Sequence, residues 1–172
     1  MTNVTIGSLT ITEGTEQAHW DYGSEPGQSD RPAVFDDLAS AAAAFGGTIK
    51  TPAVAPGGFS FSAVEVHASG SLRTAVSVYR KSDRSSFQIE QATFEDAISG
   101  QKEEMIIPSS GLRAVSLRSL PAAAWTVELP PPLLRAAPVR LAHLAWEEDG
   151  CRFLATSTCL SENDLISVAQ SL

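Results

Sequence analysis

The most constraining feature of this chain is the turn Glu148-Asp149-Gly150, which stands between two runs of alternating apolar and polar residues. The runs cover residues 139–147 and 151–158. Asp-Gly tolerates the positive φ angles that a tight turn requires, so the pattern predicts an antiparallel hairpin. The last third of the chain is therefore expected to form antiparallel rather than parallel sheet.

A helix is expected directly after this hairpin. Ser161 is suited to cap it, and Asp164 follows three residues later, as in a capping box. Leu160 before the cap and Leu165 after it form a hydrophobic staple. The apolar residues recur at helical spacing, which gives the helix one side for packing on the sheet: Leu165, Val168, Ala169 and Leu172.

A second helix is expected nearer the start of the chain. Ser29 or Asp30 is suited to cap it, Pro32 suits its first turn, and Gly46-Gly47 suits its end. Its apolar stripe would be Val34, Leu38, Ala41 and Phe45. Residues 1–29 are expected to form a polar arm with one short strand over residues 4–11, docked through His19, Trp20 and Tyr22.

The middle of the chain shows the two-residue period of strands. Residues 72–79 alternate cleanly, residues 87–91 continue the same face, and residues 59–66 suggest a strand with a bulge. Residues 94–100 suggest a helical turn, and Pro130-Pro131-Pro132 an extended connector. Further strands are expected at residues 105–107, 112–117 and 125–129. The prediction is an α+β fold over residues 30–172, in which an N-terminal and a C-terminal helix cover one face of a curved antiparallel sheet of about six to eight strands.

Composition and charge exclude several classes of function. Apolar residues make up 43% and charged residues 19% of the chain, which is typical of a globular domain. The net charge is −8 and no basic run exceeds Arg80-Lys81, which argues against nucleic acid and anionic membranes as partners. A signal peptide and an apolar stretch of ~20 residues are both missing, so we expect no membrane insertion. As written, the chain is expected to be cytoplasmic, or extracytoplasmic as the soluble part of a longer membrane protein.

The sequence offers little for catalysis, and neither a metal nor another cofactor is expected. Cys151 and Cys159 are eight residues apart on an extended segment, roughly 26 Å, so two unpaired thiols are expected. The histidines are isolated, and neither a nucleophile elbow nor a phosphate-binding loop is present. The best remaining candidate for an acid–base pair is His143 with Glu147. The acidic cluster of residues 147–149 is expected to be a solvated hairpin tip.

Three aromatic residues are the candidates for a ligand site. Trp125, Trp146 and Phe153 either line an apolar pocket or belong to the core. The non-enzymatic hypothesis is therefore a domain that senses or binds an unknown protein partner or an apolar small molecule. The alternatives are a carrier of a lipid-like ligand, which would work by burial of apolar surface, and an enzyme with an unrecognised site.

Two segments resemble a known family. Thr51-Pro52 followed by Gly58-Phe59 leads into a strand, and the segment from Leu144-Ala145-Trp146 through Asp149-Gly150 leads to the final helix. This order resembles the C-terminal extracytoplasmic domain of some bacterial anti-sigma factors and sporulation-linked membrane proteins, itself distantly similar to the half-barrel of outer-membrane lipoprotein carriers. The resemblance covers roughly residues 35–172. It implies a curved sheet closed by the last helix, with no catalytic residues.

Overall fold

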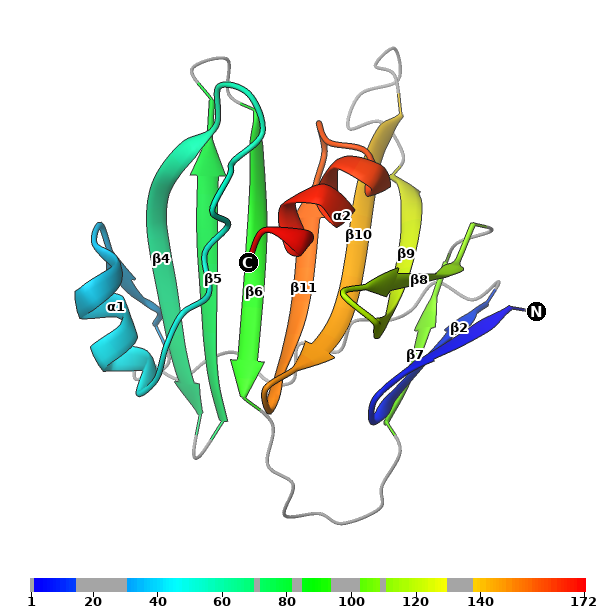
Figure 1. The fold of residues 1–172 in the computed structure, drawn as a ribbon, viewed down its shortest axis with the longest axis horizontal. Coiled ribbons are helices and arrows are strands. Elements are labelled where there is room, and N and C mark those ends of the chain that lie inside the picture. Colours follow the sequence, from blue (N-terminus) through cyan, green and yellow to red (C-terminus); the bar gives the residue numbers. More distant parts are fainter. Residues whose placement is uncertain are drawn as a thin grey trace.

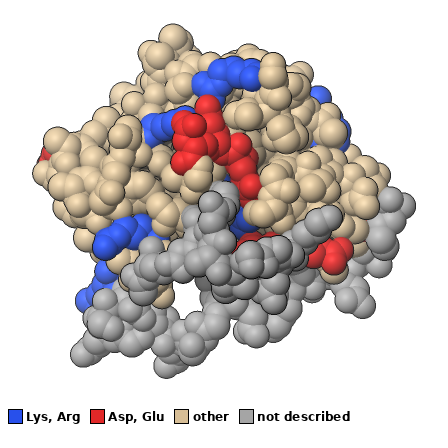
Figure 2. Space-filling view, turned by 60° about the horizontal axis from the view of Figure 1, so that its bottom comes forward, with Lys and Arg blue, Asp and Glu red and all other residues tan. Residues whose placement is uncertain are grey.

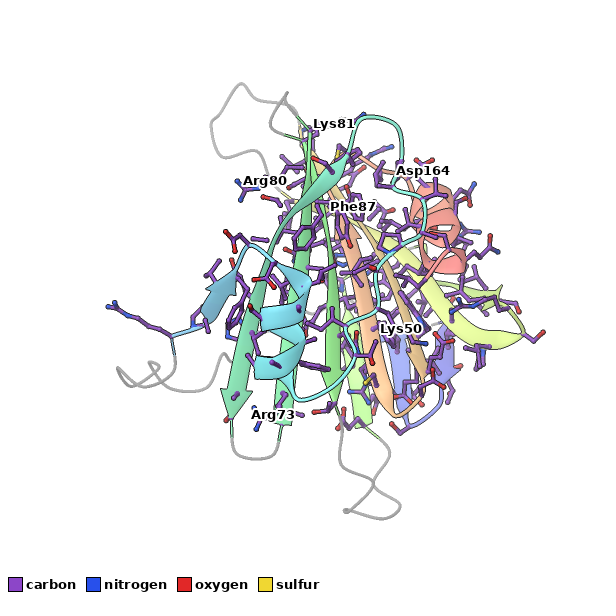
Figure 3. All side chains as sticks on the ribbon, turned by 60° about the vertical axis from the view of Figure 1, so that its left-hand side comes forward. Lys50, Arg73, Arg80, Lys81, Phe87 and Asp164 are labelled. Atoms are coloured by element: carbon purple, nitrogen blue, oxygen red, sulfur yellow. The ribbon has the colours of Figure 1, made fainter. Side chains whose placement is uncertain are left out.

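The computed structural model describes residues 2–14, 31–69, 72–81, 85–93, 103–108, 111–129 and 138–172. Two helices lie on one face of an eight-stranded antiparallel sheet of order β3-β4-β5-β6-β11-β10-β9-β8, which curls around them (Figures 1 and 3). The predicted α+β fold is therefore confirmed. The elements are β1 (Asn3–Ile6), β2 (Leu9–Glu13), β3 (Ala33–Phe35), α1 (Leu38–Phe45), β4 (Ser60–Ser69), β5 (Leu72–Arg80), β6 (Ser86–Thr93), β7 (Glu103–Ile107), β8 (Arg113–Leu117), β9 (Leu120–Leu129), β10 (Val139–Glu148), β11 (Cys151–Ser157) and α2 (Glu162–Gln170).

The C-terminal hairpin and helix form as the sequence predicts. Asp149 and Gly150 have φ angles of 51° and 73°, and the β10–β11 register places Trp146 opposite Phe153. Ser161 and Asp164 form both hydrogen bonds of the capping box at the start of α2. These local signals are decisive because a positive-φ turn and a side-chain cap each favour one backbone conformation strongly.

The face of the large sheet that carries both helices is called the helix face. Alternation along each strand brings one set of side chains to it, and α2 adds the apolar stripe that was predicted. Four of the sheet residues are alanines, which leave room for the helix to lie close to the strands. The largest apolar cluster on this face contains Phe87, Ile89, Ala122, Ala124, Ala142, Leu144, Trp146, Phe153, Ala155, Leu165, Val168 and Ala169, with others.

The first helix begins later than predicted. α1 starts at Leu38, with Asp37 as its cap, because the Asp37 carboxylate accepts a hydrogen bond from the Ser40 amide at 2.7 Å. The residues before it, Ala33–Phe35, pair with β4 as the edge strand β3. Proline is tolerated where an edge strand begins, so Pro32 is as compatible with a strand here as with a helix. Gly46, at φ 79°, ends α1 as predicted.

The middle strands agree with the predicted alternation, except at β9. β5 and β6 form the expected antiparallel pair, and the β4–β5 register shifts between Phe61 and Ala63, where a bulge was expected. β9 begins at Leu120, five residues before the predicted start at Trp125. Its first half contains Pro121 and three successive buried alanines, so no polar–apolar alternation marks it.

A second sheet, of order β1-β2-β7, packs on the face opposite the helices. The single strand expected between residues 4 and 11 is in fact the hairpin β1–β2, turned at Gly7 and Ser8. β2 pairs in parallel with β7, a long-range contact that no local pattern indicates. The resulting second core consists of Val4, Ile6, Leu9, Ile11, Ile107, Leu112, Ala123, Trp125 and Ala145.

Some predictions lie outside the described residues. These are the docking role of His19, Trp20 and Tyr22, the helical turn at residues 94–100, and the connector at residues 130–132. Neither α1 nor α2 has the length and hydrophobicity that a membrane-spanning helix needs.

Gly7 gives a direct test of how the small sheet docks. Its φ is +52°, and a Cβ there would lie 1.8 Å from Glu147 Oε2. We expect Gly7→Ala to lower the free energy of unfolding by about 1–2 kcal/mol, because an L-residue is strained at this φ, and to speed amide exchange in β1 and β2. Gly57→Ala is the matched control, since a Cβ at Gly57 meets nothing within 4 Å. Equal stability of the two variants in urea denaturation would show that Gly7 does not constrain docking.

Candidate functional site

Two of the three predicted ligand residues lie together on the helix face. The rings of Trp146 and Phe153 stack with centroids 4.9 Å apart and planes 7° apart. Both side chains are buried, and they share a cluster with Leu165 of α2. In this structure they form packed core under α2 rather than the wall of an open pocket.

Trp125 lies on the other side of the sheet. Its ring packs under the small sheet and stacks on His143, with centroids 5.0 Å apart. Residues on one strand alternate between faces, so Trp125 and its neighbour Ala124 point in opposite directions. The structure therefore does not bring Trp125 to the surface that Trp146 and Phe153 share.

His143 and Glu147 are also held apart. They are four residues apart on β10, roughly 13 Å along a strand. His143 Nδ1 lies 3.2 Å from Thr156 Oγ1, and burial lowers the pKa of His143 to about 4. Glu147 instead accepts hydrogen bonds from the amide and hydroxyl of Ser8, both at 2.9 Å, and pairs with Arg152 at 3.0 Å. Glu147 thus anchors the small sheet, and it is not placed to exchange protons with His143.

The segment between α1 and β4, residues 48–59, crosses the helix face and is called the strap (Figure 1). Buried Gln91 fastens it: its Oε1 accepts from the Lys50 amide and its Nε2 donates to the Thr48 carbonyl, both at 3.0 Å. The Ala53 amide donates to the Ser171 carbonyl at 2.9 Å, which joins the strap to the end of α2. In Figure 3, Phe87 lies between Lys81 and Lys50. Lys81 is near one end of the sheet, and Lys50 is on the strap.

Charged side chains pair with one another at one end of the helix face. The set of Lys50, Arg118, Glu148 and Asp149 is called the clasp. Glu148 pairs with Lys50 on the strap at 3.1 Å and with Arg118 on the β8–β9 turn at 2.8 Å. Arg118 also donates to the Leu172 carbonyl at 2.6 Å. A hydrogen bond from Lys50 lowers the pKa of Asp149. Figure 2 shows acidic side chains gathered in a band with basic side chains beside it.

The acidic hairpin tip is therefore only partly the solvated cluster that was expected. The side chains of Glu147 and Glu148 are 11% and 17% exposed, whereas that of Asp149 is 75% exposed. Glu147 pairs with Arg152, whereas Glu148 and Asp149 both pair with Lys50. Within the described part of the chain, no group of three or more His, Cys, Asp or Glu side chains is arranged to hold a metal ion.

A groove of about 750 Å³ lies at the other end of the helix face, where α2 begins, and is called the polar groove. Its lining includes Arg113, Thr126, Glu128, Arg140, Ala142 and Glu162. The even-numbered residues of β10 follow one another along this face, from Trp146 and Leu144 to Ala142 and Arg140. The helix face thus changes from apolar beneath α2 to polar beyond its first turn.

Opposite charges are paired throughout this groove. Arg113 Nε donates to Glu162 Oε2 at 2.7 Å, and Thr126 Oγ1 donates to Glu162 Oε1 at 2.8 Å. Arg140 pairs with Glu128 at 3.0 Å, and both of these side chains are mostly exposed. The groove thus presents donors and acceptors of both signs without a large net charge.

Sequence reasoning missed this groove and the residues that fasten the strap. Arg113, Glu128 and Arg140 come from three strands, and no local spacing relates them to Glu162. Gln91 was noted only as a strand residue, although a buried glutamine needs partners for its amide. Neither a family model, nor a curated protein, nor a solved structure matches this chain.

The hydroxyl of Tyr79 is buried without a hydrogen-bond partner among the described residues, and burial raises its pKa to about 12. The ring stacks on Phe87 at 4.7 Å. Removing an unpaired buried hydroxyl relieves a desolvation cost, so we expect Tyr79→Phe to leave stability unchanged or raise it by about 1 kcal/mol. Tyr79→Leu, which also removes the stack, should lower it by roughly 1–3 kcal/mol. A loss in Tyr79→Phe as large as in Tyr79→Leu, measured by urea denaturation, would show that the hydroxyl does have a partner.

The lowered pKa of His143 predicts a pH dependence of stability. The folded-state pKa is about 4 and the unfolded value is about 6.5, so the unfolded chain binds this proton more tightly. The contribution is fully present above pH ~6.5 and is lost as the pH falls towards ~4, by up to about 3 kcal/mol. Between pH 7 and 4.5, we expect the free energy of unfolding to fall less in His143→Gln than in the wild type. The control His67→Gln, at an exposed position, should lose as much stability as the wild type. Parallel pH profiles for the wild type and both variants would contradict this expectation.

Proposed function

We propose that this domain is a non-catalytic binding module with a sensing or regulatory role, and that it takes a polar segment of a protein partner in the polar groove. The observation that carries the proposal is the lining of this groove. Arg113, Arg140, Glu128 and Glu162 bring donors and acceptors together on one concave surface. Binding sites for polar segments use a small number of such convergent groups.

The exposed pair Arg140–Glu128 makes the groove available to a partner. Both side chains are more than half exposed, and such surface pairs contribute only ~0.2–1 kcal/mol to stability. A partner that offers a carboxylate to Arg140 and a donor to Glu128 can exchange this pair at little cost. The balance of charges favours a mixed polar peptide over nucleic acid, which requires an excess of positive charge.

The resemblance to the C-terminal domains of anti-sigma factors supports a regulatory role. It is based on two segments, Thr51-Pro52 with Gly58-Phe59 and the run from Trp146 through the hairpin to the final helix, which are determinants of the fold. An enzyme is less well supported, because His143 and Glu147 belong to separate contacts. A carrier of a lipid-like ligand is also less well supported, because Trp146, Phe153 and Leu165 fill the apolar space between sheet and helix.

Peptide display on the purified domain tests this function. Peptides selected on the wild type should lose about tenfold or more in affinity for Arg140→Glu, because the charge that recognises them is reversed. The double variant Arg140→Glu/Glu128→Arg keeps an ion pair but reverses its direction, and should also bind weakly. Arg80→Glu, an exposed change outside the groove, is the control and should bind as wild type does.

The alternative function of a lipid carrier can be tested with the same purified protein. Native mass spectrometry should show the purified domain without a bound apolar molecule. Selected peptides that bind both groove variants as tightly as wild type, or a lipid that copurifies stoichiometrically, would contradict the proposal.

A further inference from the structure

We propose that α2 acts as an intramolecular ligand of the helix face and that a helix of a partner protein displaces it. The displacing helix would be amphipathic and would carry an acidic residue in its first turn. This inference goes beyond the proposed function, since it concerns the surface beneath α2, which adjoins the polar groove and shares Ala142 with it. That surface is called the trough and consists of Ala122, Ala124, Ala142, Leu144 and Trp146, all buried in one cluster with α2.

The shape of the trough suits a helix. Its alanines come from the neighbouring strands β9 and β10, where larger side chains would keep a helix at a distance. Trp146 and Leu144 supply the larger apolar surface beside them. α2 meets the sheet with Leu165, Val168 and Ala169, which is the i, i+3, i+4 pattern of a helix bound in a groove.

One buried polar group of the trough has no hydrogen-bond partner among the described residues. Trp146 is fully buried, and its indole Nε1 has no acceptor in the described part of the chain. The buried residues of α2 are all apolar, so none of their side chains offers an oxygen to this N–H. An unpaired buried donor carries a desolvation cost. A helix with an amide or carboxylate on its apolar side would complement the trough better than α2 does.

The attachment of α2 is consistent with displacement. The helix has nine residues, which is too short to be stable by itself in water. Three residues, Thr158, Cys159 and Leu160, connect β11 to its cap. The Ser157 hydroxyl holds this connection by accepting from the amides of Cys159 and Leu160, at 3.2 and 3.1 Å. At the far end, Arg118 of the clasp donates to the Leu172 carbonyl and the Ala53 amide of the strap donates to the Ser171 carbonyl. A single hydrogen bond of this kind contributes only modestly to net stability.

The charges around the trough indicate the chemistry of the partner. Arg113 meets Glu162 in the first turn of α2, and the Asn163 side chain accepts from the same guanidinium at 2.9 Å. A competing helix therefore needs an acidic or amide residue in its first turn. A second copy of this chain is disfavoured as its source, because each copy carries a net charge of −8 and the two would repel.

Displacement can be measured with the full chain and a labelled synthetic peptide of residues 158–172 as the probe. We expect saturable binding by fluorescence anisotropy, and none for the same peptide with Leu165→Asp. Arg118→Ala, which removes the hydrogen bond to the Leu172 carbonyl, should tighten binding about threefold, in line with the loss of one contact at the end of the resident helix. Glu148→Gln, which removes the carboxylate that pairs with Arg118, should tighten binding by a smaller factor. Folded wild type and folded clasp variants that all fail to bind the peptide would overturn the proposal.

A peptide library randomised at positions 165, 166, 168 and 169 tests the role of the unpaired indole. Selection on wild type should enrich an amide or carboxylate at one of these positions, and that preference should disappear on Trp146→Phe. Enrichment of purely apolar peptides would overturn this part. Arg140→Glu should leave binding of these peptides unchanged, which separates the trough from the polar groove. Light scattering should show a monomer, and a dimer formed by exchange of α2 would overturn the choice of partner.

Discussion

The stack of Trp146 on Phe153 across the β10–β11 hairpin is the contact on which the rest of the structure depends. The Asp149-Gly150 turn sets the register that places the two rings opposite each other. Both rings are fully buried, and a buried side chain of this size contributes about 1.5–3 kcal/mol. α2 packs on them with Leu165, Val168 and Ala169, and its first turn is held by the capping box at Ser161. The alanines of β9 and β10 then follow as the residues that let this helix approach.

The two ends of the covered face differ in how their charged side chains are arranged. At one end, Lys50, Arg118 and Glu148 join the strap, the sheet and the end of α2. At the other, the strands extend beyond α2 and their side chains become charged and exposed. Between them lies an apolar layer in which the Trp146 indole N–H has no partner in the part of the chain that the structure describes. The face thus has a polar, exposed end beside an apolar surface that a short helix covers.

Local chemistry explains which parts could be predicted from sequence. Asp149-Gly150, Ser161 and Gly46 act within a few residues, so the hairpin, the cap of α2 and the end of α1 were all predicted correctly. Long-range pairing explains the failures: Val34 suits a helix stripe at the sequence level, but in the fold it pairs with Glu65 of β4. β2 and β7 lie about ninety residues apart, and only the fold relates them. The polar groove could not be predicted for the same reason. The aromatic residues could be named as candidates because large apolar side chains are easily recognised in any sequence.

The burial of Trp146 beneath α2 is tested most directly by hydrogen exchange of its indole N–H, followed by nuclear magnetic resonance. In the wild type we expect slow exchange with water, because the ring is covered although its N–H has no acceptor among the described residues. In Leu165→Asp, which introduces a charge between helix and sheet, the same proton should exchange much faster while the β10–β11 amides remain protected. An indole proton that exchanges in the wild type as fast as that of an exposed tryptophan would contradict the account.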